Sequence, residues 1–278
     1  MQSRTPDAQL NLRERHPDYQ IYLDRNERES ERVRSQLPCS IDATYGTAPL
    51  QTFDVFPSKR PNSPLFVFVH GGYWRGLDKA SYSFTAERFV RNGCTACVIN
   101  YRLLPAVNMA TLIEDVQVAL RTIQERAREY NGNPDHMILC GHSAGGHLAI
   151  LVPLLNEAIR NSVRGICSIS GLFDLEPVRD SYLNETLRLD EATARKFSPR
   201  HLDLAGLTCP VLLSVGLSES ELFIQQSRDL IAGSQGLANF EYLECPGLNH
   251  YQMVHTLMEP NHPIPEFILK RAGMRTNF

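Results

Sequence analysis

The sequence lacks long apolar runs and has no excess of basic residues. No segment approaches the roughly 18 consecutive apolar residues that a membrane-spanning helix needs. Residues 1–20 contain no apolar stretch of the kind that marks a secretory signal. The formal net charge at pH 7 is -3, whereas a nucleic-acid-binding face would concentrate positive charge. We therefore expect neither a membrane nor a nucleic acid as a partner.

The cysteines have neither an even count nor a regular spacing. Seven of them are scattered through the 278 residues, which favours reduced thiols in a cytoplasmic protein over a disulfide framework. Cys94 and Cys97 form a CxxC pattern, but no second Cys or His pair follows at the spacing of metal ligands. The sequence therefore predicts no metal and no cofactor. The expected partner is a small-molecule substrate, and the composition is also compatible with a homodimer.

Short apolar runs alternate with longer amphipathic stretches along most of the chain. The apolar runs predict strands, the last of them nearer a sheet edge, at residues 65–69, 96–99, 137–140, 165–169, 211–215 and 240–243. The amphipathic stretches predict helices, at residues 80–91, 109–130 and 222–231. Strands that alternate with helices predict an α/β fold with a mostly parallel sheet flanked by helices. Residues 41–45 and 50–56 predict an antiparallel hairpin that opens the sheet.

The chain is expected to form a single domain, residues 1–278, because no linker, repeat or low-complexity tract divides it. Residues 1–40 predict a helical segment at the periphery. Residues 176–204 are polar and are interrupted by Pro177 and Pro199. This pattern indicates a short helical cap inserted between two strands rather than a further domain.

A Gly-x-Ser-x-Gly motif follows one predicted strand and opens a predicted helix. It runs from Gly141 to Gly145 and has Ser143 at its centre. In a turn of this kind the serine hydroxyl projects at the carboxyl end of the strand, and the glycines leave room for a close approach of backbone segments. The alternative is a glycine-rich turn with an incidental serine. The placement between strand and helix favours Ser143 as the nucleophile of a hydrolase.

A second glycine-containing motif, His-Gly-Gly-Tyr-Trp, comes directly after the strand predicted at residues 65–69. Paired glycines allow a loop to point backbone N–H groups at the oxyanion that forms during acyl transfer. We assign this oxyanion hole to the backbone N–H groups of Gly72, Tyr73 and Ala144. Gly71 is the alternative in the neighbouring register.

Three side chains near these motifs are candidates for lining the substrate pocket. Tyr73 and Trp74 offer aromatic faces that suit a flat substrate group, although packing in the core accounts for Trp74 equally well. His147 lies one helical turn after Ser143, where it either packs against the core or lines the pocket.

The catalytic acid is expected in the loop after the strand predicted at residues 211–215. That loop contains two glutamates, Glu219 and Glu221. Ser218 and Glu221 have the spacing of a capping box, in which the glutamate folds back onto the start of the following helix. This structural role for Glu221 leaves Glu219 as the predicted acid.

The base is expected in the loop after the last predicted strand, where His250 lies. His255 falls in the following helix and is the weaker alternative. The order Ser143, Glu219, His250 is that of the α/β-hydrolase fold and differs from the order in the two other common serine-protease folds. The sequence therefore predicts this fold and a Ser-His-Glu triad. The histidines without such a placement are expected to be solvated: His16, His136, His201 and His262.

Four motifs together resemble the kynurenine formamidase (arylformamidase) branch of the α/β hydrolases. They read HGGYW, GHSAGGHL, VGLSESELFIQQS and LNHYQMV, and the resemblance spans about residues 42–254. In that branch the acid follows VG after two residues, which places Glu219 on the acid position, where the family usually has Asp. The resemblance implies hydrolysis of an N-formyl or N-acyl aromatic amine through an acyl-enzyme. A general short-chain carboxylesterase is the alternative enzyme, and a non-catalytic ligand receptor on the same scaffold is the alternative from another class.

Overall fold

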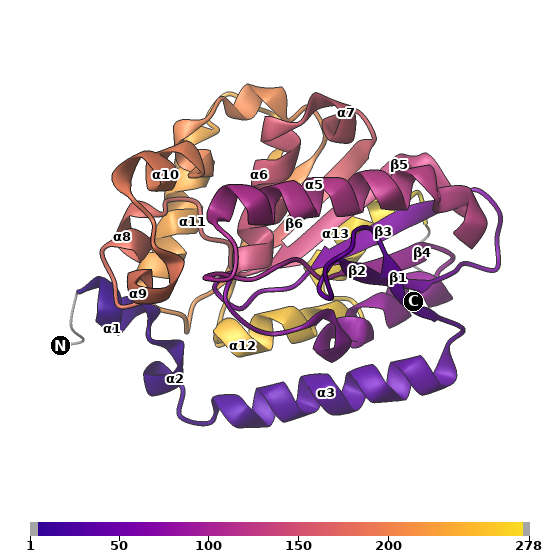
Figure 1. The fold of residues 1–278 in the computed structure, drawn as a ribbon, viewed down its shortest axis with the longest axis horizontal. Coiled ribbons are helices and arrows are strands. Elements are labelled where there is room, and N and C mark those ends of the chain that lie inside the picture. The colour runs from indigo at the N-terminus through magenta and orange to yellow at the C-terminus, as the bar shows by residue number, and fades with distance from the viewer. Residues whose placement is uncertain (1–4, 275–278) are drawn as a thin grey trace.

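The computed structural model describes residues 5–274, which form an eight-stranded sheet with helices on both faces (Figure 1). The strand order is β1-β2-β4-β3-β5-β6-β7-β8. The pairings of β1 with β2 and of β2 with β4 are antiparallel, and the pairings from β4 to β8 are parallel. The predicted α/β fold with a mostly parallel sheet is therefore confirmed. The strands are β1 Ser40–Thr44, β2 Thr52–Phe56, β3 Ser63–Val69, β4 Thr95–Ile99, β5 Gly132–His142, β6 Val163–Ile169, β7 Val211–Gly216 and β8 Phe240–Cys245.

Helices connect the parallel strands where the amphipathic pattern predicts them. The stretch at residues 80–91 differs, because its first part winds as the 3-10 helix η1 before α4 begins; Ser and Thr, which are weak helix formers, recur in it. No helix within residues 5–274 is long and apolar enough to cross a membrane. Outside the first 39 residues and the segment between β6 and β7, the helices are η1 Lys79–Ala86, α4 Glu87–Arg91, α5 Met109–Glu125, η2 Ala127–Tyr130, α6 Ala144–Leu155, α7 Glu157–Arg160, α11 Glu221–Gly233, α12 His250–Met253, η5 Val254–Met258 and α13 Pro263–Arg271, the last three of which follow β8.

Side chains alternate across β3 and divide the core into two layers. Leu65, Val67 and Val69 belong to one cluster of buried side chains, and Phe66 and Phe68 belong to the other. The first cluster includes residues of α5, α6 and α11, and the second includes residues of α4 and α13. A strand buried on both faces needs apolar residues at every position, which explains why a continuous apolar run predicted it.

The parallel register brings the carboxyl ends of the central strands to one edge of the sheet. Val69 at the end of β3 lies opposite Gly141 near the end of β5. β7 and β8 also end together, with Gly216 opposite Cys245. The loops that carry the predicted site residues therefore leave the sheet side by side, as ligand-binding loops of open parallel sheets do.

The N-terminal segment runs along the outside of the fold, and its contacts reach this edge of the sheet (Figure 1). It forms α1 Pro6–Leu10, α2 Leu12–Arg15 and α3 Tyr19–Gln36. The hydroxyl of Tyr73 donates to the carbonyl of Leu10 at 2.8 Å, and the ring of Tyr22 stacks on that of Tyr251 with 6.0 Å between centroids. The sequence pattern does not predict this packing, because two of the three buried residues of α3 are polar and so form no apolar face.

The segment expected as a cap reaches the same edge. Figure 1 shows its short helices beside α1, and Asp7 of α1 accepts a hydrogen bond from the backbone N–H of Tyr182 at 2.6 Å. The carboxyl edge of the sheet is thus approached by both segments. The cap contains α8 Glu176–Arg179, α9 Asn184–Leu187, α10 Glu191–Lys196, η3 Pro199–His201 and η4 Leu204–Gly206.

One ion pair is buried at the antiparallel end of the sheet. The ammonium group of Lys79 lies 2.6 Å from the carboxylate of Asp54 and 2.7 Å from that of Asp42. The side chains of Lys79 and Asp54 are 3% and 1% exposed. Oδ1 of Asp54 also accepts the backbone N–H of Asp42 at 3.0 Å. The pair therefore joins η1 to the two antiparallel strands.

We expect Lys79→Met to lower the free energy of unfolding by about 3 kcal/mol, because it leaves the Asp54 carboxylate buried without a counter-charge. Lys59→Met, at an exposed position, is the control and should stay within about 0.5 kcal/mol of the natural protein. Urea denaturation measures both. The double variant Lys79→Met/Asp54→Leu should regain part of the loss; no regain would show that the ion pair is not its origin.

Candidate active site

The predicted nucleophile lies in a strained turn between β5 and α6. Ser143 has φ 58° and ψ -121°, values that an L-residue adopts only where its surroundings hold it. A Cβ atom on Gly145 would lie 2.0 Å from the carbonyl oxygen of Val69, and one on Gly141 would lie 2.1 Å from that of Gly145. The two glycines therefore allow the turn to pack against the end of β3. Ser143 stands at the N-terminus of α6, whose first N–H groups are free of intrahelical partners.

Glu219 and His250 meet in a buried hydrogen bond. His250 Nδ1 lies 2.6 Å from Glu219 Oε2, and the two side chains are 4% and 0% exposed. The other carboxylate oxygen accepts the backbone N–H of Gly216 at 2.8 Å and the hydroxyl of Ser170 at 2.6 Å. The carboxylate therefore holds the imidazole ring through Nδ1, and Nε2 is the ring nitrogen that Glu219 does not contact.

Glu221 and His255, the alternative acid and the alternative base, do not take part in this hydrogen bond. Glu221 is exposed at the start of α11, and the predicted capping box is wrong: Ser220, not Ser218, is the N-cap, and it makes no side-chain cap. The cause is a turn in which the N–H of Glu219 donates to the carbonyl of Gly216 at 3.2 Å, so the helix begins after Ser220 and not directly after Ser218.

The alternative base, His255, faces the N-terminal segment. Its Nε2 lies 2.6 Å from Oδ1 of Asn26 in α3. Burial, with the nearby charge of Arg25, lowers the pKa of His255 to about 4. Glu219 therefore contacts His250 and not this residue.

The loop after β3 passes directly over Ser143. A Cβ atom on Gly71 would lie 3.0 Å from Ser143 Cβ, and one on Gly72, where φ is +109°, would lie 2.2 Å from the carbonyl oxygen of Gly76. Tyr73 also has a positive φ of 50°. The backbone at Gly71 is thus packed against the serine, and the positive φ values of Gly72 and Tyr73 turn the loop beside it.

A cavity of about 580 Å³ opens at this edge of the sheet, and Ser143 and His250 both line it. We call it the site cavity. Tyr73 lines it too, as expected. This volume falls within the usual range for small-molecule pockets.

Trp74 and His147, the other two expected pocket residues, are not among the residues that line the site cavity. Both are fully buried, and their rings meet edge to face with 5.1 Å between centroids. His147 Nε2 lies 2.7 Å from the carbonyl of Phe197, and burial lowers the pKa of His147 to about 4. Both side chains therefore pack behind the site, where they support the helix after Ser143.

Sequence reasoning missed two residues that hold the site together. His142 lines the site cavity, and its Nε2 lies 3.0 Å from the carbonyl of His250. Ser170, just after β6, supports Glu219 through its hydroxyl. His142 precedes the motif serine and could have been suspected from that position. Ser170 is one serine among many, so only the contact reveals it.

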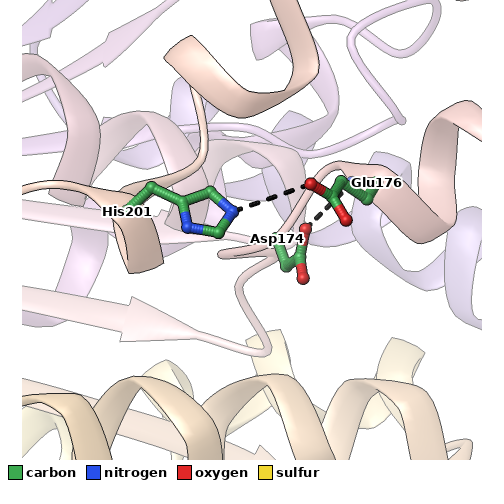
Figure 2. A group of neighbouring side chains, drawn as sticks. All are labelled: Asp174, Glu176 and His201. Carbon is green, nitrogen blue, oxygen red and sulfur yellow. Dashed lines mark hydrogen bonds and ion pairs between the residues drawn. The ribbon is translucent and has the colours of Figure 1, made fainter. Parts of the chain in front are cut away.

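One group of side chains outside the cavity has metal-ligating atoms close together (Figure 2). His201 Nε2, expected to be solvated, lies 3.9 Å from Glu176, whose backbone N–H donates to Asp174 at 3.0 Å. Arg200 pairs with Asp174 at 2.7 Å and neutralises its charge. The three groups are partly exposed, so we interpret them as an ion-pair cluster that fixes the start and the end of the cap.

Glu219→Gln should reduce kcat by about 10³-fold in any reaction that uses His250 as its base, because the amide no longer stabilises the imidazolium. Glu221→Gln, at an exposed glutamate two residues away, is the matched control and should stay within about twofold. Steady-state kinetics on the two purified variants measure both values. The reverse ranking would show that Glu219 is not the acid.

Comparison with known proteins agrees with this architecture. The chain is 28% identical to the kynurenine formamidase of Danio rerio over 256 residues, which cover 88% of this chain and 85% of that protein. A Silicibacter crystal structure described as a candidate thioesterase superposes with a TM-score of 0.80 at 28% identity, covering 89% of this chain and 92% of that one. Esterase B of Lactobacillus rhamnosis shares the fold, with a TM-score of 0.70 at 20% identity and 92% and 94% coverage.

A family model matches the part of the chain that contains most of the site. The BD-FAE model matches residues 54–230, more than half of the chain. The match includes the loop after β3, the turn at Ser143 and the loop of Glu219, and His250 follows it in the sequence. The chain therefore belongs to the BD-FAE family and is an arylformamidase-like hydrolase of the α/β-hydrolase fold.

Proposed function

We propose that the chain hydrolyses a small ester or amide through Ser143, His250 and Glu219. The observation that carries the proposal is the 2.6 Å hydrogen bond between Glu219 and His250, beside a cavity that Ser143 and His250 both line. A base that is oriented by a buried acid and lies near a serine in a strained turn is the arrangement that activates a hydroxyl. The seven cysteines are free thiols, which supports a reducing compartment such as the cytoplasm.

The mechanism follows from the positions of these groups. His250 Nε2 takes the proton of the Ser143 hydroxyl as its oxygen attacks the acyl carbon of the substrate. The oxyanion that forms is held by the backbone N–H groups of Gly72, Tyr73 and Ala144. His250 then protonates the leaving alcohol or amine, and a water molecule activated by the same ring releases the acyl group. Glu219 stabilises the imidazolium at both stages.

For the substrate we propose an N-formyl or N-acyl aromatic amine. The kynurenine formamidase relative supports the amide, and the tyrosines of the site cavity support an aromatic group, because their rings offer flat apolar faces. They are Tyr73, Tyr82, Tyr182 and Tyr251.

The serine is tested by labelling with phenylmethylsulfonyl fluoride. Intact-mass and peptide mass spectrometry should show one sulfonyl group on Ser143, and Ser143→Ala should remain unlabelled. His250→Gln should slow the labelling by about 10³-fold, because the hydroxyl loses its base. A protein that stays unmodified would instead be a non-catalytic receptor on this scaffold.

The substrate class is tested by comparing formanilide with 4-nitrophenyl acetate. We expect both to be hydrolysed, with kcat/KM for formanilide within about 10²-fold of that for the far more reactive ester, because the site is adapted to the amide. Hydrolysis of the ester without any hydrolysis of formanilide would indicate a general carboxylesterase.

A further inference from the structure

Two arginines line the site cavity. Arg75 follows the His-Gly-Gly-Tyr-Trp motif after β3, and its Nη1 donates to the hydroxyl of Thr186 at 3.1 Å. Arg13 lies in α2 of the N-terminal segment and is exposed. Within residues 5–274 neither guanidinium forms an ion pair with a carboxylate. Neither positive charge is therefore paired directly with a carboxylate in the part of the chain that the structure describes.

Aromatic rings hold both guanidinium groups in place. The guanidinium carbon of Arg75 lies 5.6 Å from the ring centroid of Tyr182, and that of Arg13 lies 5.0 Å from that of Tyr19. Burial raises the pKa of the Tyr182 hydroxyl, and the charges of Arg75 and Arg13 both oppose this rise. Both charges therefore act at the same ring, on the side of the cavity where the cap meets the N-terminal segment.

The described lining of the site cavity contains no aspartate or glutamate. Two acids lie outside this lining: Glu219 holds His250, and Asp7, whose charge also acts on Tyr182, accepts the backbone N–H of that residue. A cavity lined by charge of one sign concentrates ligands of the opposite sign. It offers no carboxylate to a ligand that brings an ammonium group.

We propose that the substrate carries a carboxylate and no ammonium group, and that Arg13 and Arg75 bind this carboxylate. The proposal rests on the proposed function, because it places the scissile carbonyl at Ser143 and the carboxylate at the other end of the same molecule. A guanidinium fork matches a carboxylate in shape and donates charge-assisted hydrogen bonds to it. The two arginines then select the substrate without taking part in bond cleavage.

The test uses three formanilides of one skeleton that differ in charge. They are 3-(2-formamidophenyl)propanoate, its primary amide and its 2-amino derivative. We expect kcat/KM for the carboxylate to exceed that for the amide and that for the amino acid by about tenfold, mainly through KM, because charge-assisted bonds to the arginines are lost or opposed. Added salt should reduce the preference, since Arg13 is exposed.

Arg13→Gln and Arg75→Gln should each lower the ratio of carboxylate to amide kcat/KM, and the double variant should bring it to about one. Arg121→Gln, at an exposed arginine of α5 outside the cavity lining, is the matched control and should keep the natural ratio. An unchanged ratio in the double variant, or a natural preference for the amide or the amino acid, would overturn the proposal.

A binding measurement distinguishes a failure of the proposed function from a failure of the proposed anion site. If Ser143 resists labelling and no formanilide is hydrolysed, calorimetric titration with 3-phenylpropanoate and 3-phenylpropanamide still tests the arginines. Tighter binding of the acid that disappears in the double variant would retain the anion site on a non-catalytic scaffold. Equal binding of the acid and the amide would reject the anion site as well.

Discussion

The buried hydrogen bond between Glu219 and His250 joins the loops that follow β7 and β8, and the rest of the site is arranged around it. The two loops are also tied through their backbones, since the N–H of Ser218 donates to the carbonyl of Leu248 at 3.0 Å. A carboxylate in this position would be costly without partners. The hydrogen bonds that Ser170 and Gly216 donate satisfy the carboxylate of Glu219. Together with His250, they connect the ends of β6, β7 and β8 through this one side chain.

A second constraint is the close approach of backbone segments around Ser143. The missing side chain of Gly145 lets α6 pack against the end of β3, and the missing side chain of Gly71 lets the loop after β3 lie on the serine. The strain at Ser143 is held by this packing. The amides of the loop and the hydroxyl of the serine are thereby fixed before a substrate arrives, as electrostatic stabilisation of an oxyanion requires.

The N-terminal segment and the cap complete the cavity that the sheet edge leaves open. Tyr73 binds the carbonyl of Leu10, and Tyr251 stacks with Tyr22, so the segment is anchored to both sides of the site. The loops at the edge of the central sheet carry Ser143, Glu219 and His250, whereas the outer segments contribute Arg13 and Tyr182 to the cavity lining.

The sequence by itself determined the order of strands and helices along the chain and the turn at Ser143, whereas the capping-box argument that separated Glu219 from Glu221 was wrong. These features depend on short-range patterns: buried strands need continuous apolar runs, and a strand-turn-helix needs glycines at set positions. Only the tertiary structure decided that Trp74 and His147 pack behind the site and that the N-terminal segment lines its cavity. It also placed Arg13 and Arg75 in the lining of the same cavity. The reason is that the burial and the partners of a side chain depend on segments that lie far apart in the sequence. Contacts between such segments produce no periodic pattern in the sequence of either segment.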